Sequence, residues 1–399
     1  MAKFKIELYK YYRQLASRKK IISFCESSLD DYSLSLCLKS MKTIIYNLLR
    51  AEDLSLFNYT SPQGLLKLRE NIISNYKLNL SPDHILITDG AQHALNLTLT
   101  TFLKPNDRIL INPQNYLGIE IPIKNARAKI VTFSQNIPNL PRDAIAKTIK
   151  KTLPKLLYIC PDFYTKFDSY PKETIDTILK LAQNLRFYIV QDLVYRHLGN
   201  NPNIPLFPPE NPFVITCNSI SKLISPGLRI GWIITKNKKK YQNLLLKKES
   251  QNVSSSTLNQ TITTQTLRYF PKLLPKIQKH YQKKTRIAIK SLKKNLPKNF
   301  TIGSDNDFFI WITGPKNFNS KNALTQALVN GVSYIPGEIF SYSKPHGNVL
   351  RLSIGSIPSE LIEKGILRLA KTLQGKNNLP RLERKLLRKL DKRIKKLFS

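Results

Sequence analysis

Short apolar runs of strand length alternate with helical patterns along the first 240 residues. The runs occupy residues 84–90, 108–113, 128–133, 155–161, 187–192, 213–218 and 229–235. The stretch 65–76 before the first run, and stretches between the runs such as 91–103 and 173–185, carry apolar residues at helical spacing. Strands that alternate with helices predict an α/β domain with a mostly parallel sheet. Because the strands are nearly continuously apolar, we expect helices to cover both faces of that sheet.

A second pattern begins after a long basic helical stretch at about 255–295. Strand-like runs follow at 307–313, 332–336 and 348–355, and an amphipathic helix is predicted at 360–373. This order predicts a smaller α+β domain. At the other end of the chain, residues 1–50 predict a helix, a short strand within ISFCES and a second helix.

The composition limits the class of protein. The chain has 399 residues, of which 41% are hydrophobic and 23% charged, as in a folded protein. It has no apolar run of about 18 residues and no N-terminal signal pattern. Four scattered cysteines and five histidines show neither disulfide nor metal-ligand spacing. We therefore expect a cytoplasmic protein with no membrane span and no metal.

The net charge of +38 attracts attention because such a protein attracts polyanions. Compositional drift in an AT-rich genome would also produce this net charge, and the basic residues would then lie on solvated faces. We favour this second explanation. The segment 376–399 predicts a basic amphipathic tail helix, with nine Lys/Arg against two Asp/Glu from residue 381 onward. Its alternatives are packing on the domain, or contact with an anionic membrane or a non-specific polyanion.

The most informative string is NSISKLISPGLRIGW at 218–232. It resembles the signature of the fold-type-I pyridoxal 5'-phosphate (PLP) enzymes of the class I/II aminotransferase family. The resemblance implies that Lys222 forms the Schiff base and that Ser219, Ser221 and Arg229 bind the cofactor phosphate. A guanidinium near the lysine disfavours its ammonium form and binds phosphate with paired donors, which suits both tasks.

The string VQDLVYRHL at 190–198 resembles the family's strand-end string. The resemblance implies that Asp192 pairs with the pyridine nitrogen and that Tyr195 donates to the ring oxygen, so both count as catalytic residues with Lys222. A carboxylate there keeps the nitrogen protonated, so the ring accepts electron density. The alternative is an aspartate that caps the next element.

Further strings resemble the family's remaining cofactor contacts. LITDGAQHALN at 86–96 implies that the backbone at Gly90, Ala91 and Gln92 faces the phosphate at a helix N-terminus. NPQNYLG at 112–118 implies that Tyr116 stacks on the cofactor ring. Thr165 falls near the family's asparagine that bonds the ring oxygen. A common strand–glycine–helix turn and an ordinary tyrosine are the alternatives.

Two strings imply a partner and a substrate. NYTSPQGLLKLRENI at 58–72 resembles the string whose tyrosine, here Tyr59, reaches the phosphate of the neighbouring subunit, which implies a homodimer. NVLRLSIG at 348–355 implies that Arg351 binds the substrate α-carboxylate. An arginine on an edge strand is otherwise most often solvated.

The chain also departs from the family pattern. CPDFYTKFDSYPKE at 160–173 lacks the Asn-Pro-x-Gly turn, Gln191 replaces an acidic residue, and CESSLDD at 25–31 lacks glycine. These departures keep open a PLP-binding aminotransferase-like protein with degenerate or different activity, as a lyase, a decarboxylase or a derivative of the family's regulator branch.

The sequence thus predicts a PLP-dependent aminotransferase that moves an amino group between an amino acid and a 2-oxo acid. With the resemblance, we expect the N-terminal part of the small domain at 1–50, the large PLP-binding domain at 51–290 and the C-terminal part of the small domain at 291–375.

Overall fold

The computed structural model describes residues 21–164, 170–198, 206–305, 308–343 and 347–375. The chain divides into two compact units, which are described separately. The larger contains residues 31–279, and the smaller contains the chain up to residue 30 and from residue 280 onward. The boundaries predicted from the sequence stay a prediction.

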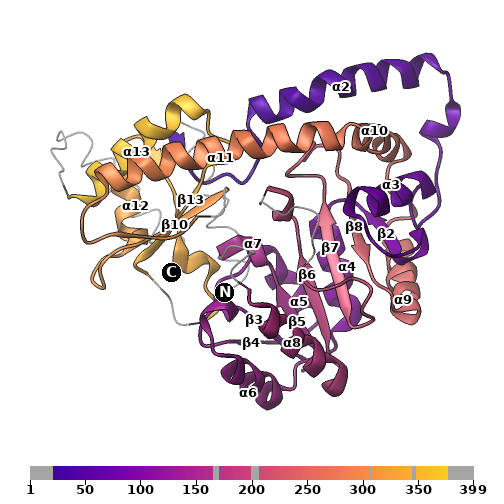
Figure 1. The fold of residues 1–399 in the computed structure, drawn as a ribbon, viewed down its shortest axis with the longest axis horizontal. Helices are drawn as coiled ribbons and strands as arrows, with labels where there is room; N and C mark the ends of the chain where they lie inside the picture. The colour runs from indigo at the N-terminus through magenta and orange to yellow at the C-terminus, as the bar shows by residue number, and fades with distance from the viewer. Residues whose placement is uncertain (1–20, 165–169, 199–205, 306–307, 344–346, 376–399) are drawn as a thin grey trace. The chain divides into compact units, whose positions relative to one another are not determined.

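A seven-stranded sheet forms the centre of the larger unit (Figure 1). In spatial order its strands are β2 (Ile85–Thr88), β8 (Gly231–Ile234), β7 (Val214–Ser219), β6 (Tyr188–Asp192), β5 (Leu156–Ile159), β3 (Arg108–Ile111) and β4 (Lys129–Thr132). β8 is antiparallel to both of its neighbours, and the other adjacent pairs are parallel. The predicted mostly parallel sheet is confirmed.

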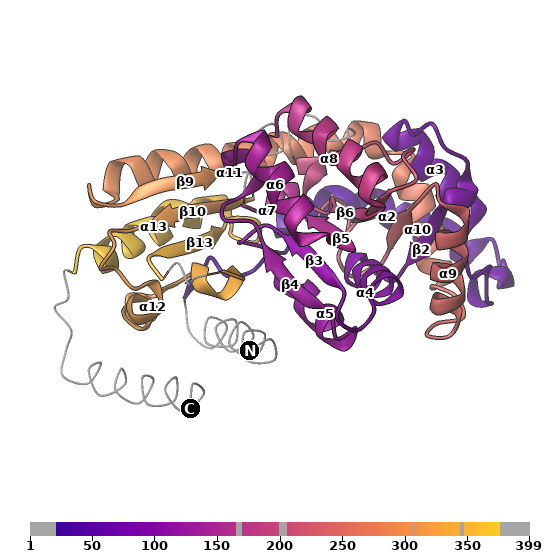
Figure 2. The same ribbon diagram turned by 90° about the horizontal axis from the view of Figure 1, so that it is seen from below.

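Helices lie on both faces of this sheet, as the apolar strands predicted. Figure 2 shows α6 and α8 on one side of the strands and α4 and α5 on the other. The helices of the larger unit are α2 (Asp31–Arg50), α3 (Leu66–Tyr76), α4 (Ala91–Phe102), α5 (Glu120–Asn125), α6 (Arg142–Thr152), α7 (Pro161–Tyr164), α8 (Lys172–Leu185), α9 (Lys238–Glu249), α10 (Thr257–Leu267) and the first part of α11 (Phe270–Asn295). Short 3-10 turns include η1 (Leu54–Phe57) and η6 (Arg196–Leu198).

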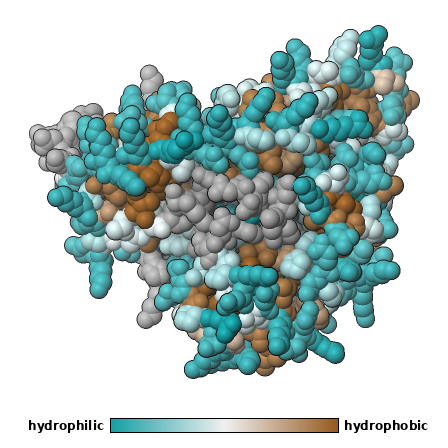
Figure 3. Space-filling view, in the orientation of Figure 1, coloured by the Kyte–Doolittle hydropathy of each residue, from teal (hydrophilic) through white to brown (hydrophobic). Residues whose placement is uncertain are grey.

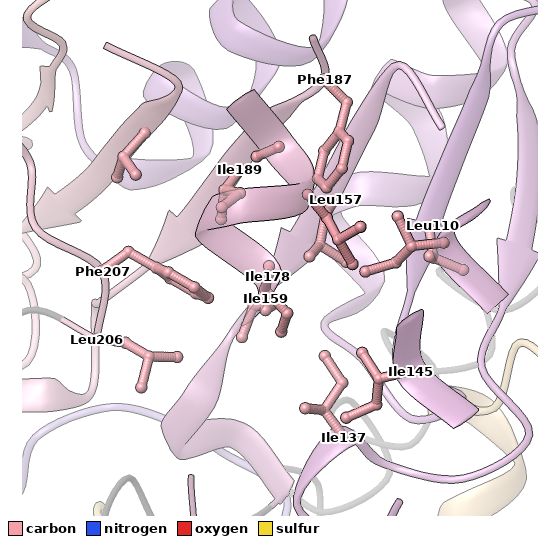
Figure 4. Close-up of a cluster of buried hydrophobic side chains, with 14 of the residues drawn as sticks. Leu110, Ile137, Ile145, Leu157, Ile159, Ile178, Phe187, Ile189, Leu206 and Phe207 are labelled. Atoms are coloured by element: carbon pink, nitrogen blue, oxygen red, sulfur yellow. The ribbon is translucent and has the colours of Figure 1, made fainter. Parts of the chain in front are cut away.

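The core of the larger unit lies between the sheet and helices α6 and α8. Leu157 and Ile189 from the strands and Ile145 and Ile178 from the helices are fully buried there (Figure 4). Each such side chain contributes about 1.5–3 kcal/mol on removal from water. The core therefore fixes the strands, and with them the loops that follow the strands.

The smaller unit is built on a four-stranded antiparallel sheet in the order β12-β13-β10-β9. Its elements are β1 (Ile22–Ser23), β9 (Thr301–Asp305), β10 (Phe309–Thr313), α12 (Ser320–Val329), β11 (Val332–Ser333), β12 (Ile335–Pro336), β13 (Val349–Ser353) and α13 (Ser359–Leu373). β1 pairs in parallel with β11, so the N-terminal segment joins the C-terminal part of the chain. The predicted α+β character is confirmed, and the sequence missed β9 and α12.

The surface is polar on the face that Figure 3 presents, where hydrophilic residues cover most of the described area. Within the described residues, no helix combines the length and the apolar character that crossing a membrane requires. The predicted N-terminal helix before residue 21 and the predicted tail helix at 376–399 lie outside the described residues.

Candidate active site

Four of the strings singled out in the sequence meet at one edge of the seven-stranded sheet, namely 86–96, 112–118, 190–198 and 218–232. β2, β5, β6 and β7 end at this edge, and the antiparallel β8 begins there. The register pairs Asp192 with Cys217, and it pairs Gly231 with both Ser219 and Thr88. The carboxyl edge of an open α/β sheet is where such folds bind ligands.

Asp192 closes strand β6 as a buried carboxylate. Tyr158 on β5 donates its hydroxyl to Asp192 Oδ2 at 2.9 Å, and the Val194 N–H donates to Oδ1 at 3.3 Å. Burial raises the pKa of Asp192 to about 6, and the two hydrogen bonds only partly oppose that shift. Burial, together with the neighbouring Asp192 charge, holds the pKa of Tyr158 well above its ordinary value, so the tyrosine remains a donor.

Lys222 lies one turn past the end of β7. Its Nζ is 5.8 Å from the centroid of the Tyr195 ring, and Tyr195 is buried just beyond Asp192. The Ser221 N–H donates to Ser219 Oγ at 3.3 Å. The structure therefore brings the lysine, the tyrosine and the serine pair to the same edge as the buried carboxylate.

The start of helix α4 is built around glycine. Gly90 has φ +90° and, as the residue before the helix, offers no side chain to the first N–H groups, among them those of Ala91 and Gln92. Arg229 lies against it: one guanidinium nitrogen donates to the Asp89 carbonyl at 3.0 Å. A Cβ on Gly90 would lie 2.5 Å from Arg229 Nη2. This cradle of N–H donors and a guanidinium fits a phosphate.

Gly231 allows β8 to approach this helix. A Cβ at Gly231 would lie 2.5 Å from the carbonyl carbon of Gly90 and 2.8 Å from the Ala91 nitrogen. The close approach of two backbones therefore places the Arg229 loop beside the uncapped end of α4.

Tyr116 and Gln92 form a pair at the same edge. The Tyr116 hydroxyl donates to Gln92 Oε1 at 3.0 Å, and Gln92 Nε2 donates to the Gly118 carbonyl at 2.7 Å. Tyr116 also makes an edge contact with Phe163, with centroids 6.4 Å apart. The side chain of Gln92 thus orients Tyr116, a role that the sequence did not indicate.

A buried polar network lies behind these residues and was also missed. His197 Nε2 is 2.8 Å from the Tyr76 hydroxyl and 3.1 Å from Asn218 Nδ2. Asn218 Oδ1 in turn accepts the Ser219 N–H at 2.7 Å. Burial lowers the pKa of His197 to about 3, so the ring stays neutral. The network ties the segment after Tyr195 to the end of β7.

The departures from the family pattern have structural counterparts. Gln191 bonds the Phe207 backbone through both amide atoms, at 2.8 and 2.9 Å, and so holds a loop in place. In α7, the buried Asp162 lies 4.0 Å from Arg196 Nη1. Thr165 lies outside the described residues.

Two predicted site residues belong to other elements. Tyr59 follows η1 in the larger unit and is 80% exposed. Arg351 belongs to the smaller unit, on β13, and is buried. Its guanidinium carbon lies 4.4 Å from the Phe309 ring centroid and 4.3 Å from that of Phe340, so the two rings hold it.

Comparison with known proteins identifies the family. The family "Aminotransferase class I and II" matches residues 19–369, and the chain belongs to it. The chain is 28% identical over 328 residues to aromatic-amino-acid aminotransferase 1 of Thermococcus litoralis, covering 77% of each. It is 27% identical over 330 residues to an HTH-type transcriptional regulator of Bacillus subtilis, covering 80% of this chain and 68% of the regulator.

A solved structure supports the fold. The α-aminoadipate aminotransferase LysN of Thermus thermophilus, in complex with N-(5'-phosphopyridoxyl)-L-leucine, superposes with a TM-score of 0.81 at 24% identity. The match covers 90% of this chain and 93% of that one. The chain is an aminotransferase-family enzyme, and its cofactor is PLP. The donor set at the carboxyl edge fits this cofactor, since the α4 cradle suits a phosphate and buried Asp192 suits a protonated ring nitrogen.

Replacing Gly90 by alanine should displace Arg229 from the cradle. We expect Gly90→Ala to weaken PLP binding about tenfold or more, since losing a hydrogen bond to a charged group costs about 1.5–3 kcal/mol. The matched control is Gly227→Ala in the same loop as Arg229, where the new Cβ meets only Ser225 Oγ at 3.5 Å. Titration of the apoprotein with PLP measures both, and equal losses would contradict the cradle.

Asp192 should make the stability of the apoprotein depend on pH. Its folded pKa of about 6 lies above the ordinary 3.8, so its contribution is complete below pH 4 and is lost as the pH rises through 6. The loss is about 3 kcal/mol, at about 1.4 kcal/mol per unit. Between pH 4 and pH 7, the free energy of unfolding in urea should fall by this amount more in the wild type than in Asp192→Asn. A wild-type-to-variant difference that is constant with pH would contradict the assignment.

Proposed function

We propose that this enzyme transfers an amino group between an amino acid and a 2-oxo acid, with Lys222 as the residue that moves the proton. The observation that carries the proposal is the position of Lys222 Nζ beside Tyr195, at the same sheet edge as buried Asp192. A general base needs a proton-accepting nitrogen at the reacting carbon and surroundings that exclude water.

Each residue of the edge has a proposed task. When bound, PLP supplies the carbonyl that takes up the amino group and a ring that accepts electron density from the substrate Cα. Ser219, Ser221, Arg229 and the N-terminus of α4 hold the phosphate. Asp192 holds a proton on the ring nitrogen, and Tyr158 orients its carboxylate.

The remaining cofactor contacts are proposed in the same way. Tyr195 donates to the ring oxygen and Tyr116 covers one ring face. Lys222 Nζ would take the proton from the substrate Cα and return it to the cofactor carbon that is bonded to the amino nitrogen. Arg351 binds the substrate α-carboxylate, which its position between Phe309 and Phe340 favours because the two rings fix the guanidinium plane.

Removing the Lys222 amine tests the central role. We expect Lys222→Ala to lower amino transfer by at least about a thousandfold, because proton transfer at Cα loses its base. The variant should also lose the absorbance of PLP linked to lysine while retaining PLP that can be removed by dialysis. A panel of amino acids with 2-oxoglutarate, including aromatic ones and 2-aminoadipate, identifies the amino donor. Unchanged turnover in the variant would refute the assignment.

A PLP-binding protein without amino transfer is the second candidate. The regulator relative favours it, as does α7, where Asp162 pairs with Arg196 in the segment that lacks the family's asparagine turn. The same panel separates the candidates, since this one predicts lysine-linked PLP without 2-oxo acid formation.

The family is typically dimeric, and we propose that Tyr59 reaches the phosphate of the second subunit. The support is an exposed apolar group on and after η1, where Leu54, Phe57 and Tyr59 are 80%, 68% and 80% exposed. Exposed apolar patches of this kind are typical of interfaces.

Charges in this patch should separate the subunits. We expect Leu54→Asp with Phe57→Asp to give a monomer with weakened PLP binding, because carboxylates cannot be buried unpaired in an interface. The control is Leu246→Asp on α9, a leucine that is 63% exposed. Light scattering after gel filtration gives the mass, and a dimeric double variant would exclude this interface.

A further inference from the structure

The amino edge of the seven-stranded sheet, opposite the candidate active site, is strongly basic. Five segments meet there: 104–108, 124–129, 150–155 and 184–187 lead into β3, β4, β5 and β6, and 236–240 follows the antiparallel β8. Together they contain thirteen Lys/Arg and one acidic residue, Asp107. Strands of four or five residues separate the two edges by about 13–17 Å.

The backbone places several of these residues in one row. Arg108 pairs with Lys129 in register, the Lys155 N–H donates to the Arg108 carbonyl at 2.7 Å, and the Tyr188 N–H donates to the Lys155 carbonyl at 3.2 Å. Adjacent strands are about 4.8 Å apart, so the three basic residues Lys155, Arg108 and Lys129 of this row span about 10 Å. Glu210 before β7 and Asp83 before β2 are the acidic residues on the other half of this edge, where the lysines of 236–240 follow β8.

A lysine cluster of Lys104, Lys155, Lys239 and Lys240 joins this row. Lys240 Nζ lies 5.0 Å from the Phe102 ring centroid and 5.2 Å from that of Tyr188. Burial, with the charges of Lys155, Lys239 and Lys104, lowers the pKa of Lys240. Within the described part of the chain, none of the four lysines forms an ion pair with a carboxylate within 4.0 Å.

Neighbouring like charges without carboxylate partners repel one another, and a ligand that carries regularly spaced negative charges relieves this repulsion. A linear row of cations matches a linear polyanion, and each neutralised phosphate also releases a condensed counterion. We propose that this basic edge binds the phosphate backbone of nucleic acid without sequence preference, independently of the amino-transfer site.

The test compares two sets of substitutions with the same loss of charge in the full-length, PLP-loaded enzyme. Lys104, Lys155, Lys239 and Lys240 are changed to Gln in one variant. In the control, the exposed Lys272, Lys276, Lys279 and Lys283 of α11 are changed to Gln. Fluorescence anisotropy with a labelled mixed-sequence 30-nucleotide RNA measures the dissociation constant between 50 and 300 mM KCl.

We expect the edge variant to bind at least about tenfold more weakly and to lose about three units from the slope of log K against log salt concentration. The control should change by less than about threefold, and both should keep wild-type amino transfer and melting temperature. Equal losses in the two variants would mean that only the overall charge of the chain attracts RNA, which overturns the proposal.

Two other outcomes also overturn it. One is the absence of RNA binding by the wild-type enzyme at 50 mM KCl. The other is binding to phosphatidylserine vesicles, but not to RNA, that the edge substitutions abolish, because the partner is then a membrane surface.

Discussion

A carboxylate held away from water is the constraint on which the larger unit depends. Burying the Asp192 carboxylate is costly, and burial accordingly raises its pKa to about 6. The hydrogen bonds that the Tyr158 hydroxyl and the Val194 N–H donate to Asp192 offset part of this cost. A protonated heterocycle beside the carboxylate would offset the rest of this cost, so the burial of Asp192 favours a cofactor of that kind.

The two edges of the seven-stranded sheet carry different chemical groups. At the carboxyl edge, helix N-termini and strand ends collect donors and a buried acid. At the amino edge, the segments that enter the strands carry lysine and arginine, and neighbouring registers align them. Because both edges belong to the same set of strands, the basic surface lies at the opposite end of the strands from the residues that we propose move protons.

The sequence predicted the strands, the alternation with helices and the strings at the carboxyl edge, because apolar period and short motifs are local signals. The sequence did not reveal the role of Tyr158. This residue lies within an apolar strand, so the hydrophobic pattern marks it as a core residue and does not indicate that its hydroxyl donates to Asp192. His197, Tyr76 and Asn218 were missed for the same reason, since their contacts join residues 21 and 121 positions apart. The residues of β9 and α12 show only weak hydrophobic periodicity, so tertiary packing determines their secondary structure.

Lys222 and Arg229 lie in the loop that connects β7 to β8. The two ends of this loop are adjacent, because Ser219 and Gly231 pair with each other in the sheet. Residues 220–230 therefore form a loop whose two ends are held together by the sheet, and the roles proposed for Lys222 and Arg229 require both side chains to face one ligand. Variation along this loop can change side chains, but one inserted or deleted residue would turn one of these two away from the other. The number of residues between Ser219 and Gly231 is therefore the constrained property, and we expect related chains to keep this number even where the amino acids of the loop differ.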